Sequence, residues 1–194
     1  MKSRLCSIAP TIALSLSFAP IAYAQAQAQE LSAAEIAFHA FFSRFTDGEW
    51  AYHTRMTDAG GAILFEGEDI RVYRFGIRDR YVVENAFSEN EDGARTHIGV
   101  QLFGVDTKTG TIHISQFWPW QPTKLGDVTA SLERREDGET GLSGLARPAG
   151  QDFPEIRFSC EFQGNDVYQC TSHVTTEEGD TYLGNVETLT RRVE

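Results

Sequence analysis

The segment Thr46-Asp47-Gly48-Glu49-Trp50-Ala51-Tyr52-His53-Thr54-Arg55-Met56 decides the fold, because the periodicity of the chain changes within it. Ahead of Thr46, aromatic and aliphatic residues recur at helical spacing, and Ser32 with Glu35 forms a capping-box pattern. From Trp50 onward, apolar and polar residues alternate, which is typical of strands with one buried face. The sequence therefore predicts a helix over Ser32–Arg44, followed by a first strand over Trp50–Met56.

The remainder of the chain reads as short strands separated by turns rich in glycine and acidic residues. The expected strands are Ile63–Ile77, Arg80–Ser88, Thr96–Val105, Ile112–Trp118, Val128–Arg135, Gly141–Arg147, Phe158–Phe162, Tyr168–Val174 and Tyr182–Val193. About ten strands at hairpin spacing, with no helix between them, exclude a parallel α/β sheet. The pattern predicts one all-β domain, an up-and-down antiparallel barrel of about ten strands with one short N-terminal helix.

The first 24 residues have the order of a secretory signal peptide. Lys2 and Arg4 precede the apolar run Ile8–Ile21, and Ala22-Tyr23-Ala24 is a small-x-small cleavage site. The apolar run is short and contains two prolines, so an uncleaved membrane anchor is the weaker interpretation. We expect residues 1–24 to be removed, which leaves a barrel domain of residues 25–194 in the periplasm or outside the cell, with no membrane insertion.

The strongly negative net charge of the chain limits the classes of molecule that it can bind. The whole chain has 17 basic and 28 acidic residues, and two of the basic ones belong to the expected signal. The mature chain would then have a net charge of −13, from 15 basic and 28 acidic residues. Nucleic acids and anionic membranes require a basic face, so neither is expected as a partner. The sequence does not indicate an oligomeric state.

Two cysteines remain after the expected cleavage, Cys160 and Cys170. An even pair in an exported protein indicates a disulfide. The segment Gly164-Asn165-Asp166 predicts a three-residue hairpin loop that places the two cysteines opposite one another, facing the interior. Because the loop that such a bridge closes is short, its expected stabilisation is limited to roughly 2–3 kcal/mol. A redox or metal role is the weaker interpretation, because no C-x-x-C is present.

Several motifs together resemble the calycin group, the lipocalins and their relatives. They are Gly48-x-Trp50 after a helix, the stretch Gly99–Asp106 followed by Thr109-Gly110, the stretch Glu178–Tyr182, and an arginine on the final strand. Within that group the chain looks like a bacterial domain-of-unknown-function family of small exported lipocalin-like barrels. The resemblance implies that Trp50 packs across the barrel base under a basic residue of the last strand. That residue would be Arg191, by alternation with Leu189 and Val193, and Arg192 is the alternative.

Enzyme motifs are missing, and so is a clear cofactor site. The sequence has no G-x-S-x-G, H-E-x-x-H, phosphate-binding loop or dinucleotide fingerprint, and we expect no enzymatic activity. An interior histidine could bind haem, but the strand histidines alternate with apolar neighbours: His53 with Trp50 and Tyr52, His97 with Val100 and Leu102, His113 with Ile112 and Ile114, and His173 with the Cys170 face. These positions predict outward-facing histidines, with no metal or other cofactor.

The most promising binding feature is Trp118-Pro119-Trp120, where a strand enters the irregular segment Pro119–Gly126. Aromatic rings at a barrel mouth offer stacking surfaces to a small apolar or amphipathic molecule. We expect Trp118 and Trp120 at the mouth, with Tyr73 and Tyr81 lining the cavity. Few charges lie in that segment, which indicates selection by shape and apolarity. The alternative is a structural or partner-binding domain whose barrel is filled, with Trp118 capping the core.

Overall fold

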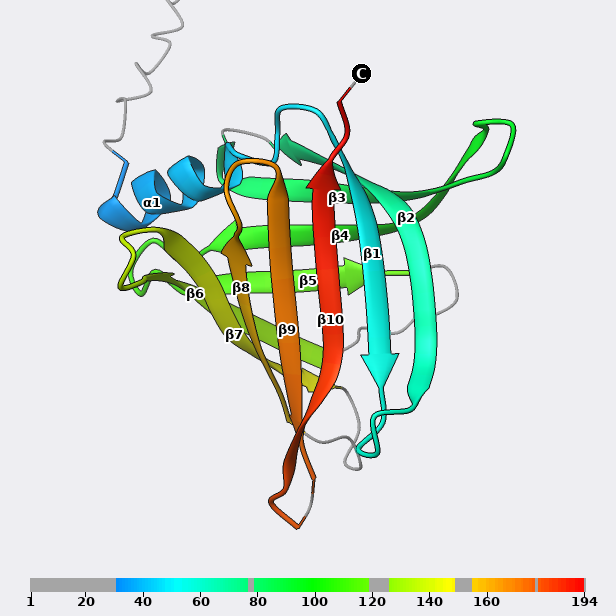
Figure 1. Cartoon of the computed structure of the whole chain (residues 1–194). Helices are drawn as coiled ribbons and strands as arrows, with labels where there is room; N and C mark the ends of the chain where they lie inside the picture. Colours follow the sequence, from blue (N-terminus) through cyan, green and yellow to red (C-terminus); the bar gives the residue numbers. More distant parts are fainter. Residues whose placement is uncertain (1–30, 77–78, 119–125, 149–154, 177, 194) are drawn as a thin grey trace, which may run out of the picture. The chain divides into compact units, whose positions relative to one another are not determined.

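Ten antiparallel strands and one helix form the described part of the chain in the computed structural model, which describes residues 31–76, 79–118, 126–148, 155–176 and 178–193 (Figure 1). The elements are α1 (Ala33–Phe42), β1 (Glu49–Thr57), β2 (Ile63–Phe75), β3 (Tyr81–Glu89), β4 (Arg95–Val105), β5 (Ile112–Phe117), β6 (Gly126–Arg134), β7 (Thr140–Pro148), β8 (Ile156–Phe162), β9 (Val167–Thr175) and β10 (Thr181–Arg191). Each strand pairs with its neighbour in the chain, and β1 pairs with β10. The sheet is therefore a closed up-and-down barrel, as the strand pattern predicts.

The helix begins where the capping box places it. The Ser32 hydroxyl accepts a hydrogen bond from the Glu35 amide at 3.2 Å, and the Glu35 carboxylate accepts one from the Ser32 amide at 2.9 Å. The α-helix ends at Phe42, two residues before the expected end, and a turn continues the chain to Phe45. Gly48 then adopts a φ of +102°, a conformation that side chains other than glycine rarely accept, and it directs the chain into β1.

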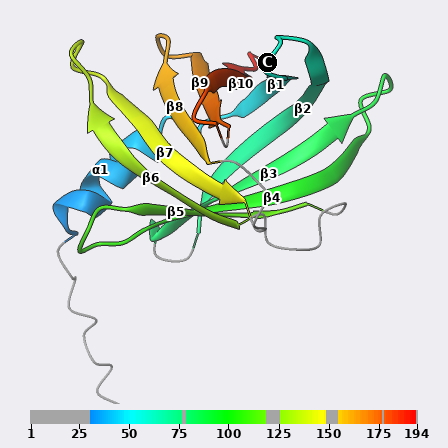
Figure 2. The same cartoon turned by 90° about the horizontal axis from the view of Figure 1, so that it is seen from below.

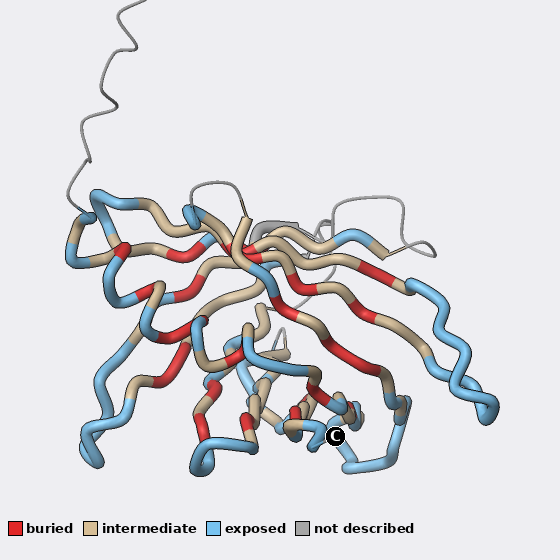
Figure 3. Tube along the Cα trace, turned by 90° about the horizontal axis from the view of Figure 1, so that it is seen from above, coloured by how far each residue is buried: buried red, intermediate tan, exposed pale blue. Residues whose placement is uncertain are grey.

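The two ends of the barrel differ. Helix α1 lies at the end where β1 begins and β10 ends, which we call the helix end (Figures 1 and 2). The opposite end, where β1 ends and β10 begins, is called the far end. Large apolar side chains fill the helix end, and all are at most 8 % exposed: Phe38, Phe41, Phe42, Phe45, Trp50, Phe103, Phe162, Tyr168 and Leu189. The tips of the hairpins are exposed (Figure 3).

First and last strands meet at Trp50 and Arg191. These residues are register partners, and the Arg191 guanidinium carbon lies 4.6 Å from the centroid of the Trp50 ring. The Trp50 indole nitrogen donates a hydrogen bond to the Phe45 carbonyl at 3.0 Å. Arg192 instead lies near Glu49 and Glu89. The contact expected from the calycin resemblance is present, and Arg191 rather than Arg192 makes it.

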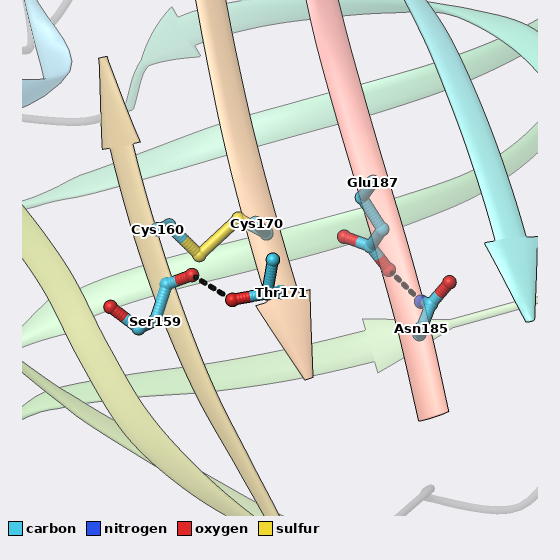
Figure 4. The surroundings of a disulfide bond; sticks show 6 residues. All are labelled: Ser159, Cys160, Cys170, Thr171, Asn185 and Glu187. Atoms are coloured by element: carbon cyan, nitrogen blue, oxygen red, sulfur yellow. Dashed lines mark hydrogen bonds between the residues drawn. A yellow bond between two sulfur atoms is a disulfide. The ribbon is translucent and has the colours of Figure 1, made fainter. Parts of the chain in front are cut away.

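The disulfide joins Cys160 on β8 to Cys170 on β9, within one hairpin (Figure 4). The two cysteines are register partners, and the hairpin closes through a hydrogen bond from the Gln163 amide to the Val167 carbonyl at 2.8 Å. Cys160 is 4 % exposed and belongs to the core. The pairing, the hairpin and the inward orientation are as the sequence predicts, and the bond is consistent with a non-reducing compartment.

Candidate functional site

Strand register places several charged side chains on the inner face of the barrel. Trp50 is fully buried, and its register partner Arg71 lies on the same face of the sheet. The same alternation brings Asp69 opposite Tyr52 and Glu84 opposite Tyr73. Arg71 and Glu84 are only 4 % and 5 % exposed. Charged residues are rarely this buried unless they are paired, so their partners matter.

Arg71 is paired through all three of its guanidinium nitrogens. Its Nη2 donates to Asp69 Oδ2 at 2.7 Å, its Nε donates to the other oxygen of Asp69, and its Nη1 donates to Glu84 Oε1. The guanidinium carbon also lies 4.0 Å from the ring centroid of Tyr52 and 5.1 Å from that of Trp118. The Tyr73 hydroxyl hydrogen-bonds to Glu84. Arg71 thus joins β2 to β3 at mid-barrel.

A fourth charged residue, Glu187 on β10, extends this cluster around the wall. Its register partners are Cys170 on β9 and Thr54 on β1, so it shares the inner face with the disulfide (Figure 4). The Asn185 amide donates to Glu187 Oε1 at 2.8 Å, and the Thr54 hydroxyl donates to the Asn185 carbonyl oxygen at 2.9 Å. Tyr52 also hydrogen-bonds to Glu187. We call Arg71, Asp69, Glu84 and Glu187 the inner charged cluster.

Burial sets the electrostatics of the inner charged cluster. It raises the pKa of both Glu187 and Asp69 above the ordinary carboxyl range, although Arg71 acts in the opposite direction on each. Burial opposes the charge of Arg71, but Glu84 and Asp69 more than offset it, so the pKa of Arg71 lies above its usual value. Burial likewise raises the pKa of Tyr52, Tyr73 and Tyr168. Those tyrosines therefore stay protonated.

Apolar side chains return on the inner face toward the far end. Met56 and Phe65 are register partners, and alternation along β1 and β2 places them on the same inner face as Tyr52 and Asp69. They are nevertheless 43 % and 54 % exposed. A Cβ at Gly67 would lie 2.7 Å from Phe65 Cζ, so the Phe65 ring lies against this glycine. The Trp118 ring lies against Gly99 in the same way. The interior is therefore layered, with apolar side chains at the helix end, charges at mid-barrel and apolar side chains again at the far end.

The structure brings some of the predicted binding residues together and separates others. Tyr73 lies on the inner face beside Glu84, and Trp118 lies near Arg71. Tyr81 lies on the outer face, because its neighbour Val82 is fully buried inside the barrel, and the Tyr81 ring packs against Gly76. Trp120 lies outside the described residues. Whether any of these side chains binds a ligand stays a prediction.

Each of the four strand histidines is partly or fully exposed. His53 lies 3.1 Å from Glu66 on the outer face. His97 is exposed, as expected, but not by alternation with Val100 and Leu102: Phe103 and Gly99 face inward on β4, whereas Val100 and Leu102 do not. A register shift between Ala86 and Phe87 turns His97 outward against Phe87. Among the described residues, no group of three or more histidine, cysteine or acidic side chains is arranged to hold a metal ion.

A shallow open depression of about 490 Å³ lies elsewhere, over β6, β7 and β8. Its lining is mostly polar and small: Thr111, Thr129, Ala130, Ser131, Glu133, Ser143, Gly144, Leu145, Arg157 and Phe158. Neither Trp118 nor the inner charged cluster lines it. Within the described part of the chain, no helix is both long and apolar enough to cross a membrane.

Alternation alone contained a signal for the inner charged cluster. Arg71 lies two residues from Tyr73, which the sequence places inside, and Glu187 lies two residues from Leu189, which served to orient Arg191. Sequence reasoning passed over both residues because charged side chains in strands usually mark the solvent face. A charged residue at the same alternating position as core residues of its strand was the sequence feature that could have predicted the cluster.

Two solved structures share the barrel. One is the S-type phycobiliprotein lyase CPES from Guillardia theta, at 12% identity and a TM-score of 0.52, covering 81% of this chain and 93% of that one. The other is Rv2717c from M. tuberculosis, at 12% identity and a TM-score of 0.54, covering 84% of this chain and 99% of that one. At such identities the likeness shows the barrel fold alone, which is consistent with a lipocalin-like barrel. No family model and no curated protein matched the sequence.

Proposed function

We propose that this protein is an exported carrier or receptor that holds a small amphipathic molecule inside its barrel. One observation carries the proposal: half-buried polar side chains line the inner face at mid-barrel, although a filled barrel would exclude them. They include Tyr52, Gln101, Gln116, Asn185 and Glu187. Register places each of these residues inside, and their remaining exposure supports an interior that solvent reaches.

The energetics support the same conclusion. A buried ion cluster adds little to stability compared with apolar side chains of similar volume, because desolvating the charges offsets their attraction. Ionisable groups with perturbed pKa values inside a cleft are candidates for a functional site. Met56 and Phe65 at the far end, together with the Trp118 ring near Arg71, supply apolar surface for the rest of an amphipathic molecule.

The absence of enzymatic activity stays a prediction. One neighbour in fold is a lyase by name, so chemistry on a bound molecule is the second candidate function. Native mass spectrometry of protein purified from its own host would distinguish the two. A retained molecule that leaves unchanged on denaturation supports binding, whereas a molecule released in altered form after incubation supports catalysis.

Titration with the neutral fluorescent probe N-phenyl-1-naphthylamine tests binding directly. The mature, oxidised protein should enhance the probe's emission, and Trp118→Ala should weaken its affinity by about fivefold, since one aromatic contact is worth roughly 1 kcal/mol. Phe117→Ala is the matched control, because Phe117 is 56 % exposed and adjacent in sequence but on the opposite face of β5. Absence of binding by the wild-type protein would favour the filled structural barrel.

A further inference from the structure

The inner charged cluster discriminates between classes of amphipathic ligand, an inference that rests on the proposed binding function. Arg71 is an unsuitable anchor for an anionic head group. All three of its guanidinium nitrogens already donate to Asp69 and Glu84, and aromatic rings of Tyr52 and Trp118 lie close to it. A carboxylate or phosphate entering the barrel would therefore meet a guanidinium whose charge is already balanced by two carboxylates.

Glu187 has the opposite character. It is half-buried on the inner face, and no cation among the described residues forms an ion pair with it. Its neighbours on β10 and β1 are the Asn185 amide, the Tyr52 hydroxyl and Thr54, and its register partner on β9 is Cys170. Arg71 attracts Glu187 only at longer range, and Glu84 repels it. The carboxylate thus has capacity for a further cationic partner.

Charge balance at mid-barrel favours the same partner. When ionised, the inner charged cluster has three carboxylates and one guanidinium. Burial raises the pKa of Asp69 and Glu187, which is the response of acids whose negative charge is incompletely compensated. A ligand that brought one positive charge to this depth would neutralise part of the excess, whereas an anion would add to it.

The far end supplies the second, independent observation. Met56 and Phe65 are on the inner face and remain about half exposed, and the Trp118 ring lies against Gly99 on the same inner face. Exposed apolar side chains on an inner face are covered when an apolar group lies against them. A molecule with its charge at mid-barrel and its apolar part at the far end matches both layers, and the reverse orientation matches neither.

We propose that the barrel binds a cationic amphiphile with its head group first, that Glu187 is the specificity-determining contact for the head group, and that the apolar tail lies against Met56, Phe65 and Trp118. The tail then points toward the far end, and the head group lies beside Tyr52. Tyr52 offers an aromatic face as well as a hydroxyl, both of which suit an ammonium group.

The test uses three competitors with the same ten-carbon chain: decylammonium, decanoate and decanol. Each displaces N-phenyl-1-naphthylamine from the mature, oxidised protein at pH 7.5, below its micellar concentration. Decylammonium should displace the probe at a concentration about tenfold lower than decanoate, with decanol between them. Glu187→Gln should abolish this preference. Glu68→Gln is the matched control and should keep it, because Glu68 is exposed on the outer face of β2, next to Asp69.

A separate fluorescence experiment tests the orientation of the bound amphiphile. A bromine on the tail carbon of 10-bromodecylammonium should quench tryptophan fluorescence in the wild-type protein. It should not quench Trp50 in the double variant Trp118→Phe with Trp120→Phe, because Trp50 lies at the helix end. Quenching of Trp50 in that variant would overturn the head-first orientation.

The outcomes separate the two proposals. If the neutral probe binds and decanoate displaces it as well as decylammonium does, the barrel is a binding protein and the cationic selectivity is wrong. If Glu187→Gln binds the probe but keeps the preference, Glu187 is not the selective contact. If the wild-type protein binds neither the probe nor any competitor, the proposed function and this inference both fail. The wild-type preference needs no variant, so it decides the issue even if Glu187→Gln misfolds.

Discussion

The guanidinium of Arg191 lies over the indole of Trp50, with its carbon 4.6 Å from the ring centroid, and so joins the last strand of the barrel to the first. Arg191 also donates to the carbonyl of Arg44 at 2.7 Å and to that of Asp47, and it pairs with Asp166 at 3.1 Å. One side chain thus connects β10, β1, the turn after α1 and the β8–β9 loop. We interpret this contact as the closure of the helix end.

Trp50→Ala should lower the free energy of unfolding by about 3–5 kcal/mol, because it leaves a large cavity among buried aromatic rings. Arg191→Ala should lower it by about 1–2 kcal/mol through the lost ring contact and carbonyl hydrogen bonds. Arg192→Ala is the control and should change it by less than about 0.5 kcal/mol, since its ion pairs are at the surface. Urea unfolding measures all three, and an Arg192→Ala loss equal to that of Arg191→Ala would contradict the assignment.

Reduction of the Cys160–Cys170 bond should destabilise the barrel without unfolding it at room temperature. The two residues are only ten apart, so the loop that the bond closes is short and the expected loss is about 2–3 kcal/mol. Urea unfolding of oxidised and reduced protein, with thiol titration to verify each state, provides the measurement. Free thiols in protein purified under oxidising conditions would contradict the disulfide itself.

Arg71→Leu should be among the most destabilising single substitutions in the interior, with a loss of about 3–5 kcal/mol. It would leave Asp69 and Glu84 buried without their cation. Adding Asp69→Asn and Glu84→Gln should recover part of that loss, because the charges themselves are then absent. Denaturation midpoints of the single and triple variants test this, and a triple variant less stable than Arg71→Leu would show that the cluster is not the cause.

The raised pKa of Glu187 determines how its contribution to the free energy of unfolding changes with pH. The folded protein holds this proton to higher pH than the unfolded chain, whose carboxyl titrates near the ordinary value of 4.5. Stability from this group is therefore largest below that value and falls as the pH rises through the folded-state pKa. Glu187→Gln is neutral throughout, so its stability relative to wild type should increase from pH 4 to pH 8.

Unfolding curves of wild type and Glu187→Gln at several pH values between 4 and 8 measure this difference. Asp69 has the same sign but is present in both proteins, so its contribution cancels to first order. A difference that is constant with pH, or that shrinks as the pH rises, would show that Glu187 is charged at little cost in the folded state.

Cleavage after Ala24 remains a prediction from the N-terminal sequence. Mass spectrometry of protein recovered outside the cytoplasm should give a chain that begins at Gln25. Ala24→Arg should block processing, because the cleavage site requires a small residue at this position. Recovery of full-length chain with an intact N-terminus outside the cytoplasm would indicate an uncleaved leader instead.

Sequence periodicity was sufficient for the barrel, its helix and its disulfide. Alternation with a period of two fixes which face of a strand is buried. Turns of hairpin length join strands that are adjacent and antiparallel, which gives the up-and-down topology. The cysteine register followed from the three-residue loop between β8 and β9. These features depend on residues close together in the chain, so their geometry can be derived locally.

The candidate site was predictable only in part. Tyr73 and Trp118 lie on the inner face near Arg71 and Glu84, as a cavity lining requires, whereas Tyr81 lies outside because Val82 takes the inward position. The bulge of β4 at Ile98, opposite Ala86 and Phe87, could not be predicted from the sequence, because one extra residue changes the alternation of β4 without any mark in the sequence.

By itself, the sequence determined the all-β architecture, the start of the helix at the Ser32 capping box and the pairing of Cys160 with Cys170, because short-range periodicity, capping and loop length control these features. Only the tertiary structure decided that Arg71, Asp69, Glu84 and Glu187 meet inside the barrel. They come from β2, β3 and β10, and it is the pairing of β10 with β1 that brings Glu187 around to the others. Each residue alone looks like an ordinary solvent-facing charge, and closure of the sheet is what removes it from water.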